Sequence, residues 1–275
     1  MTALAAARVY GTVLATRVKE DLTYRVNYAM GALLRFIPMV TTVYLWYAIY
    51  QTGNGADTVK AGMTYRDVVA YFLLVYVSRG FSSMPGMSAE IGKEIRDGHL
   101  NRYLVRPMDY FWYQAAYRMA HKVVFWAVAL VTFPPVFWIL RDFFTYSPRA
   151  VEWAASVVLL AQGFAIGLLF SFLIGALAFW FLEVSTFLFI VMGLELFASG
   201  HLIPLNFLPE GVQGFLLWLP FAYEAYWPCA VLLGKAPPGG LGTVVGVGFL
   251  WILAMYGACR LLWNAGLKRY SAVGG

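Results

Sequence analysis

Six long apolar stretches separated by polar segments dominate the chain. They cover about residues 33–51, 68–85, 123–140, 153–179, 185–200 and 241–262. A helix needs about 20 predominantly apolar residues to cross about 30 Å of hydrocarbon. The pattern therefore predicts an all-α membrane protein with six transmembrane helices. Spans one and two lie within residues 33–85, spans three to five within 123–200, and span six within 241–263.

The N-terminal segment has a different pattern, because its apolar positions form a single stripe. The stripe recurs every four residues at Tyr10, Leu14, Val18, Leu22 and Val26, and Arg17, Asp21 and Arg25 form a charged ladder beside it. One-sided apolarity of this kind is typical of a helix that lies in the membrane interface. We predict an interfacial amphipathic helix over residues 1–32. A coiled-coil helix or a helix that binds a soluble partner is the alternative.

Between the fifth and sixth spans, prolines divide an apolar segment. Pro204, Pro209, Pro220 and Pro228 split it into pieces too short to cross the hydrocarbon. Non-helical backbone at that depth has to be shielded by protein or to line a cavity. We therefore predict a re-entrant helical hairpin over residues 201–240.

Composition mainly excludes classes of protein. Of the 275 residues, 61% are hydrophobic and 12% are charged, about half the charged share of a soluble domain. The net charge of +6 is not gathered on one soluble face, so membrane lipid and not nucleic acid is the expected partner. Two cysteines, Cys229 and Cys259, are too few for a disulfide framework or a zinc site.

Basic residues set the expected orientation. Most of the 20 lysine and arginine residues fall on one side of the predicted spans, together with the N-terminus and the tail at residues 264–275. Loops on the cytosolic side are enriched in such residues. We expect both termini and the long loop at residues 86–122 to be cytosolic, in the cell inner membrane, with the hairpin facing outward.

The loop at residues 86–122 contains a short amphipathic pattern. Ile91 and Ile95 lie one turn apart with charged residues on the other faces, and Gly98 ends this helix in the manner of a C-cap. Leu100, Tyr103 and Leu104 form a second apolar cluster before Pro107. A docking element for a partner protein has this form. An interfacial helix resting on lipid is the alternative.

Motifs for catalysis are missing from the sequence. No G-x-x-x-x-G-K-[ST], H-E-x-x-H or G-x-S-x-G occurs, and His99, His121 and His201 are scattered over three regions. We expect no enzyme activity in this chain, and no cofactor or metal bound by it.

Ionisable residues within apolar stretches are candidates for function. An unpaired charge there costs about 2.5–3.5 kcal/mol on insertion scales, so each calls for a partner or a role. Arg79, Glu183, Glu195 and Glu224 are the residues concerned. We expect Glu195 either to line a substrate path or to pair with Arg79, and a structural ion pair or hydrogen bond is the alternative for all four. The candidates for a substrate path or gate are Arg79, Glu195, Pro204, Pro209, Pro220 and Glu224.

The loop and the broken segment together resemble the ABC export permeases of the ABC-two membrane superfamily. The loop matches the family's Ile-Arg-x-Gly-x-Leu and Leu-x-Arg-Pro stretches at Ile95, Arg96, Gly98, Leu100, Leu104, Arg106 and Pro107. The broken segment matches at Ile203, Pro204, Leu205, Phe207, Pro209, Leu219, Pro220, Phe221, Pro228, Leu233 and Gly234. The order of the elements also agrees over most of the chain.

This resemblance implies a permease subunit of an ATP-driven exporter. A dimer of cytosolic ABC ATPase subunits would bind ATP and Mg, and a second permease chain, identical or a sister subunit, would pair with this one. A coupling helix at about residues 89–97 would carry the ATPase motion into the spans, and the hairpin would act as an outer gate. The implied docking residues are Glu90, Ile91, Lys93, Glu94, Ile95, Arg96, Gly98, Leu100, Arg102, Arg106 and Pro107. A stand-alone ion-coupled secondary transporter is the alternative function.

Overall fold

The computed structural model describes residues 3–23, 30–31, 34, 36–52, 59–181, 185–235 and 239–270. Within these ranges the chain forms α-helices and short 3-10 helices, and it contains no β-strand beyond an isolated bridge between Lys60 and Met63. The predicted all-α class is therefore confirmed for the described part of the chain.

The longer helices are α1 (Ala3–Thr23), α3 (Phe36–Gln51), α4 (Tyr65–Ser82), α7 (Tyr110–Ile139), α8 (Ala150–Ala176), α9 (Ser185–Ala198) and α12 (Leu241–Arg269). The shorter elements are α5 (Met87–Arg96), α6 (Asn101–Leu104), η1 (Arg141–Phe143), η2 (Leu177–Phe179), η3 (Leu205–Phe207), α10 (Glu210–Trp218), η4 (Pro220–Tyr223) and α11 (Tyr226–Leu232). The η elements are single turns of 3-10 helix.

Four helical stretches of the described residues are long and apolar enough to cross a membrane, by length and composition. They contain α4, α7, α8 and α12, at the positions of predicted spans two, three, four and six. The helices α3 and α9 occupy the positions of spans one and five, but their 16 and 14 residues extend over only about 24 and 21 Å. The chain is a multi-pass membrane protein, and the count of six spans stays a prediction.

Helix α8 lies at the centre of the fold because its glycines let other segments approach its backbone. A Cβ atom at Gly163 would lie 2.6 Å from the carbonyl oxygen of Tyr223, and one at Gly167 would lie 2.2 Å from that of Ser82. Real Cβ atoms do not approach other atoms so closely. Because these two glycines have no side chain, η4 and the end of α4 contact the backbone of α8 directly.

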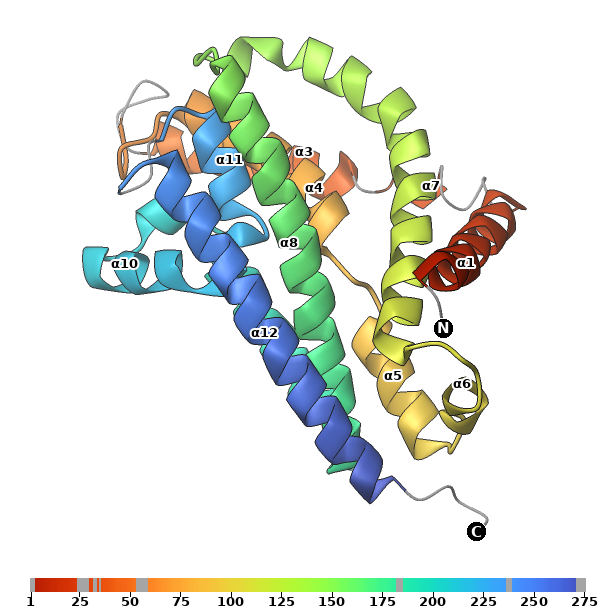
Figure 1. The fold of residues 1–275 in the computed structure, drawn as a ribbon. Coiled ribbons are helices and arrows are strands. Elements are labelled where there is room, and N and C mark those ends of the chain that lie inside the picture. The colour runs from red at the N-terminus through yellow and green to blue at the C-terminus, as the bar shows by residue number, and fades with distance from the viewer. Residues whose placement is uncertain are drawn as a thin grey trace.

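Helix α12 runs beside α8 in the same direction (Figure 1). A hydrogen bond also links the two helices: the side-chain amide of Gln162 in α8 donates to the carbonyl oxygen of Val245 in α12 at 2.8 Å. Near the other end, the rings of Phe172 and Trp263 lie 5.0 Å apart. The two helices therefore contact each other near both the Val245 end and the Trp263 end of α12.

Helix α7 begins at Tyr110, whereas the apolar pattern alone placed the start of the third span at Val123. The Asp109 side chain accepts hydrogen bonds from two backbone N–H groups of the first turn and so caps the helix. Figure 1 shows α7 bending over its last third, which contains Pro134 and Pro135. A proline pair removes backbone hydrogen bonds and bends a helix in this way.

Helix α1 packs along α7 (Figure 1). The guanidinium of Arg17 lies 4.4 Å from the centre of the Tyr117 ring, and Asp21, which is buried, lies 3.7 Å from His121. Charged positions of α1 thus contact another helix of the same chain. The location of α1 in a membrane interface stays a prediction.

The segment with four prolines forms short helices, as its sequence predicts. The 9 residues of α10 and the 7 residues of α11 extend over about 14 and 11 Å, too little to cross a bilayer. Every residue of α11 is buried, whereas Phe215 and Trp218 of α10 are exposed. Insertion of this segment from the outer side stays a prediction.

Candidate functional site

Helices α5 and α6 form a compact unit at the end of the molecule where α12 also ends (Figure 1). Gly98 follows α5 with a φ of +73°, a conformation that favours glycine, and turns the chain toward α6. The side chains of Ile91, Ile95 and Leu100 are 0%, 6% and 0% exposed. The apolar stripe of the loop therefore packs inside the chain and does not face outward.

A buried carboxylate holds the unit together. Glu94 is 5% exposed and accepts hydrogen bonds from the Tyr103 hydroxyl and the Arg102 guanidinium, both at 2.9 Å, and from the Tyr110 hydroxyl. Burial, followed by the contact with Tyr113 and then Glu94, raises the pKa of Tyr103, which keeps this hydroxyl a donor. Glu94 thus acts as an internal brace that joins α5, α6 and the start of α7.

Two basic residues of α7 brace the junction between α4 and α5. Arg118 forms an ion pair with Glu90 and donates to the carbonyl oxygen of Pro85. Lys122 is buried and donates to the carbonyl oxygens of Gly80 and Ser83 at the end of α4. A cation at a helix C-terminus satisfies carbonyl groups that have no partner within the helix.

The outer surface of the unit is charged with an apolar tip. Val105 is 83% exposed and Leu104 is 44% exposed. The other exposed residues of this surface are Lys93, Asp97, His99, Asn101, Arg102, Arg106 and Pro107. Val105 was not among the predicted docking residues. It could have been included because it is an apolar residue that directly follows Leu104, just after the end of α6. Of the predicted docking residues, Lys93, Arg102, Arg106 and Pro107 are exposed, Glu90, Arg96 and Gly98 are half-buried, and Ile91, Glu94, Ile95 and Leu100 are buried.

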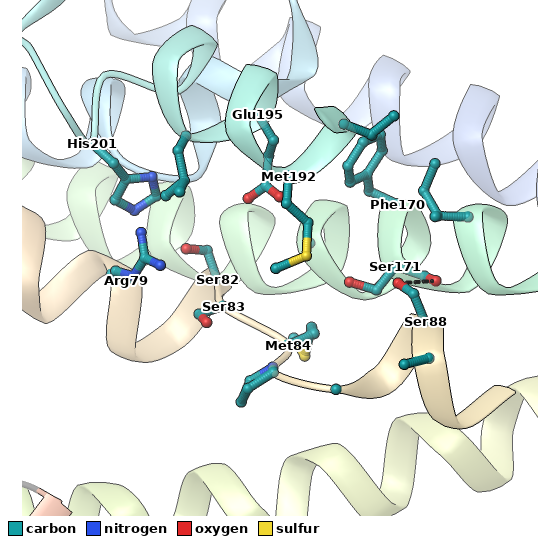
Figure 2. A pocket seen from close by; sticks show the side chains of 17 residues that line it. Arg79, Ser82, Ser83, Met84, Ser88, Phe170, Ser171, Met192, Glu195 and His201 are labelled. Carbon is teal, nitrogen blue, oxygen red and sulfur yellow. Dashed lines mark hydrogen bonds between the residues drawn. The ribbon is translucent and has the colours of Figure 1, made fainter. Parts of the chain in front are cut away.

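A cavity of about 190 Å³ lies between the end of α4, the first turn of α5, the middle of α8 and α9. Arg79, Glu195 and His201 line it, and Figure 2 shows their polar ends pointing into the same space. Phe170 and Met192 supply apolar walls. Gly167, which closely approaches the end of α4, is also part of the lining.

Within the described residues, no carboxylate lies within 4.0 Å of the Arg79 guanidinium. Glu195 instead lies close to Glu224, which is 1% exposed. The expected alternative in which Glu195 pairs with Arg79 is therefore not the arrangement found. Both acids still contribute to the electrostatic environment of the arginine.

Two further polar groups at the cavity escaped sequence reasoning. His201 is 8% exposed; its Nδ1 atom lies 2.6 Å from Ser199 Oγ, and its Nε2 atom has no partner among the described residues. The Ser82 hydroxyl, at 2% exposure, also has no partner there. Neither residue belongs to a motif, and only packing of α4 against the end of α9 brings them together.

The hairpin prolines lie away from this cavity. Pro204 and Pro220 are buried by packing, and Pro209 is exposed before α10. The main-chain oxygen of Glu224 accepts from Ser78 at 2.6 Å, which ties α4 to the hairpin. The structure thus brings Arg79, Glu195 and Glu224 close together, and the role of the three prolines in a substrate path or gate stays a prediction. Glu183 lies outside the described residues.

A metal site has no support in the described part of the chain, where no group of three or more His, Cys, Asp or Glu residues could hold an ion. Cys229 and Cys259 are buried as free thiols in the packed interior. The arrangement therefore offers two features with functional potential, namely the exposed tip of the α5–α6 unit and the polar cavity.

Comparison with known proteins places the chain in a family. The family described as ABC-2 family transporter protein matches residues 36–274. No curated protein and no solved structure matched the chain. Because the family match runs from α3 to the end of α12 and covers well over half of the sequence, the chain belongs to the ABC-2 transporter family.

Proposed function

We propose that the chain is the membrane-spanning permease subunit of an ATP-driven exporter. In this proposal a dimer of separate cytosolic ABC ATPase subunits binds ATP and Mg and hydrolyses the ATP. The α5–α6 unit docks on that ATPase. Movement of the ATPase subunits is transmitted through this unit and drives a substrate along a path that includes the polar cavity. The exposed tip of a rigidly braced α5–α6 unit, in a chain of this family, is the observation that carries the proposal.

Bracing makes the unit suited to transmit motion. Ile91 packs so closely on Gly175 that a Cβ atom added at Gly175 would lie 2.8 Å from the Cβ of Ile91. In addition, Ser88 Oγ donates a hydrogen bond to the carbonyl oxygen of Ser171 at 2.9 Å. Both contacts join α5 to α8, and Arg118 and Lys122 join its beginning to α7. A displacement of α5 would therefore move α4, α7 and α8 together rather than bend a loop.

The membrane arrangement belongs to the same proposal. We infer six spans, with α3 and α9 as spans one and five, cytosolic termini and the hairpin outside, in the cell inner membrane. Apolar side chains on α9 such as Phe189 and Leu194 are 81% and 63% exposed on the single chain. Lipid and a second permease chain, identical or a sister subunit, would cover them.

The first experiment is affinity purification of the tagged chain from its native cells in a mild detergent, with mass spectrometry of the proteins that stay bound. Recovery of a stoichiometric P-loop ATPase supports the proposal, and a sister permease in the same complex would define the pairing. A folded chain that transports without any ATPase would instead indicate an ion-coupled secondary transporter.

Variants of the tip test the docking surface directly. We expect Val105→Asp with Arg106→Glu to weaken ATPase binding more than tenfold, because loss of a central contact costs about 2 kcal/mol or more. Arg141→Glu, at an exposed arginine of η1, is the matched control and should change nothing. Gly98→Pro cannot keep a φ of +73° and should lower stimulated ATPase activity. Full ATPase binding and stimulation in the tip and Gly98 variants would contradict the docking role.

A further inference from the structure

The wall of the cavity formed by α4 and α5 presents donors without partners. The guanidinium of Arg79 has no acid within 4.0 Å among the described residues, and the buried Ser82 hydroxyl is unpaired in the same part of the chain. Figure 2 shows both side chains directed toward the space between α4 and α9. Arg79 is half-buried, and a cation that forms no ion pair is costly inside a membrane, which makes an anion its natural complement.

The start of α5 adds to this wall. Gly86, Ser88 and Ala89 line the cavity, and the 10-residue helix begins there without a side-chain cap. Backbone N–H groups in the first turn of a helix have no partner within the helix and carry a partial positive charge. Their field therefore has the same sign as that of Arg79.

The opposite wall carries one acid among its lining residues, Glu195. Glu224 is 1% exposed and lies outside the lining. The cavity therefore sets Arg79, Ser82 and the start of α5 against a single lining acid. His201 Nε2 offers a further unpaired polar atom, whose role depends on the ring tautomer.

The remaining walls are apolar. Phe170 and Ile174 of α8 and Val191 and Met192 of α9 face the same space. With about 190 Å³, the cavity is smaller than the pockets of about 300–1,000 Å³ that enclose whole drug-sized ligands. It has room for a headgroup and the adjoining part of a chain, while the rest of a long chain would lie along α9.

We propose that this cavity binds the anionic headgroup of an amphiphilic substrate, with Arg79 as its counter-ion and Ser82 and the first turn of α5 as hydrogen-bond donors. The inference rests on the proposed transport function and names the substrate class. A carboxylate and a phosphate share the required chemistry. The apolar walls and α9 take the hydrocarbon part of the substrate.

The test measures binding to the full chain, without an ATPase, in a non-ionic detergent by native mass spectrometry. The probes are dodecanoate, dodecyl phosphate and dodecyltrimethylammonium, which share a chain length and differ in headgroup. We expect both anions to bind at least about tenfold more tightly than the cation, corresponding to about 1.4 kcal/mol. Preference between the two anions then separates a fatty-acid-like from a phospholipid-like substrate, and either preference supports the site.

Variants link that selectivity to the cavity. Arg79→Gln should abolish the preference for anions, Arg79→Lys should retain most of it, and Arg141→Gln, at an exposed arginine of η1, should leave it unchanged. A diazirine-bearing dodecanoate, crosslinked to the unmodified chain, should label Met192 or Phe170, which gives a measurement independent of any variant. Equal binding of cation and anions, an unchanged preference in Arg79→Gln, or crosslinks confined to residues outside the cavity would overturn the inference.

The two proposals can fail separately. A chain that recruits an ATPase but shows no anion selectivity would refute the cavity assignment alone. A chain that binds anions at Arg79 but neither recruits nor stimulates an ATPase would refute the exporter proposal and keep the site.

Discussion

A substitution of Gly175 by alanine probes the contact through which α5 sits on α8. The added Cβ would lie 2.8 Å from Ile91 Cβ, 3.0 Å from Ile91 Cγ2 and 3.1 Å from the carbonyl oxygen of Ser88. None of these atoms is the free end of a flexible side chain. Helix α5 therefore has to move away from α8 before the alanine fits.

Two opposing effects set the size of the change. Overpacking in a tightly packed interior costs about 1–3 kcal/mol. Replacing a helical glycine by alanine gains about 0.5–1 kcal/mol. We expect a net loss of about 1–2 kcal/mol in the free energy of unfolding. Gly257→Ala in α12, where no atom lies within 4 Å of the added Cβ, should show only the gain.

The assay is thermal unfolding of both variants in the same detergent, followed by tryptophan fluorescence. For a chain of this length, 1 kcal/mol corresponds to about 2–4 °C in Tm. A difference of about 2 kcal/mol between the variants should therefore separate their midpoints by about 4–8 °C. ATPase stimulation by the Gly175→Ala chain should also fall, because α5 no longer transmits motion to α8.

Equal Tm values for Gly175→Ala and Gly257→Ala would refute the close packing of α5 on α8. Reduced stability with unchanged ATPase stimulation would keep the packing argument and refute its role in coupling. Gly257→Ala is the control for Gly175→Ala, because both variants add the same methyl group to a helix.

Two further substitutions test the braces of the α5–α6 unit by chemical denaturation. Glu94→Ala leaves the buried hydroxyls of Tyr103 and Tyr110 without their acceptor and should cost about 2–5 kcal/mol, against about 1 kcal/mol for Tyr103→Phe; equal losses would contradict the central role of the carboxylate. Lys122→Met removes the cation that caps two carbonyl groups at the end of α4 and should cost about 1–3 kcal/mol. Lys93→Met at an exposed position should stay within about 0.5 kcal/mol, and equal stability of the two lysine variants would refute the capping role.

Local pattern was sufficient for much of the fold. The apolar stretches predicted the positions of α4, α7, α8 and α12, since helices that cross a membrane must be apolar over their length. Gly98 predicted the end of α5 because few other residues adopt its φ. Prolines predicted the short helices between Gly200 and Leu241 because proline ends or bends a helix.

Local pattern was insufficient where polar residues meet across distant segments. The charge of Lys122 suggested a solvent-facing end of a loop, yet the end of α4 buries it and supplies its acceptors. Ile91 and Ile95 formed a stripe suited to a partner, yet α8 and the rest of the unit cover them. A stripe has the same appearance in a sequence whether it packs inside the chain or against another protein.

The sequence by itself determined the class of protein, the positions of its long helices and its family resemblance, because these depend on composition and on residues close together in the chain. Tertiary structure alone decided which residues form the cavity: Arg79, Ser82, Glu195 and His201 come from separate parts of the chain. Their grouping depends on how closely α4, α9 and the hairpin approach α8. That approach is set by backbone contacts at Gly163 and Gly167, which no periodicity in the sequence records.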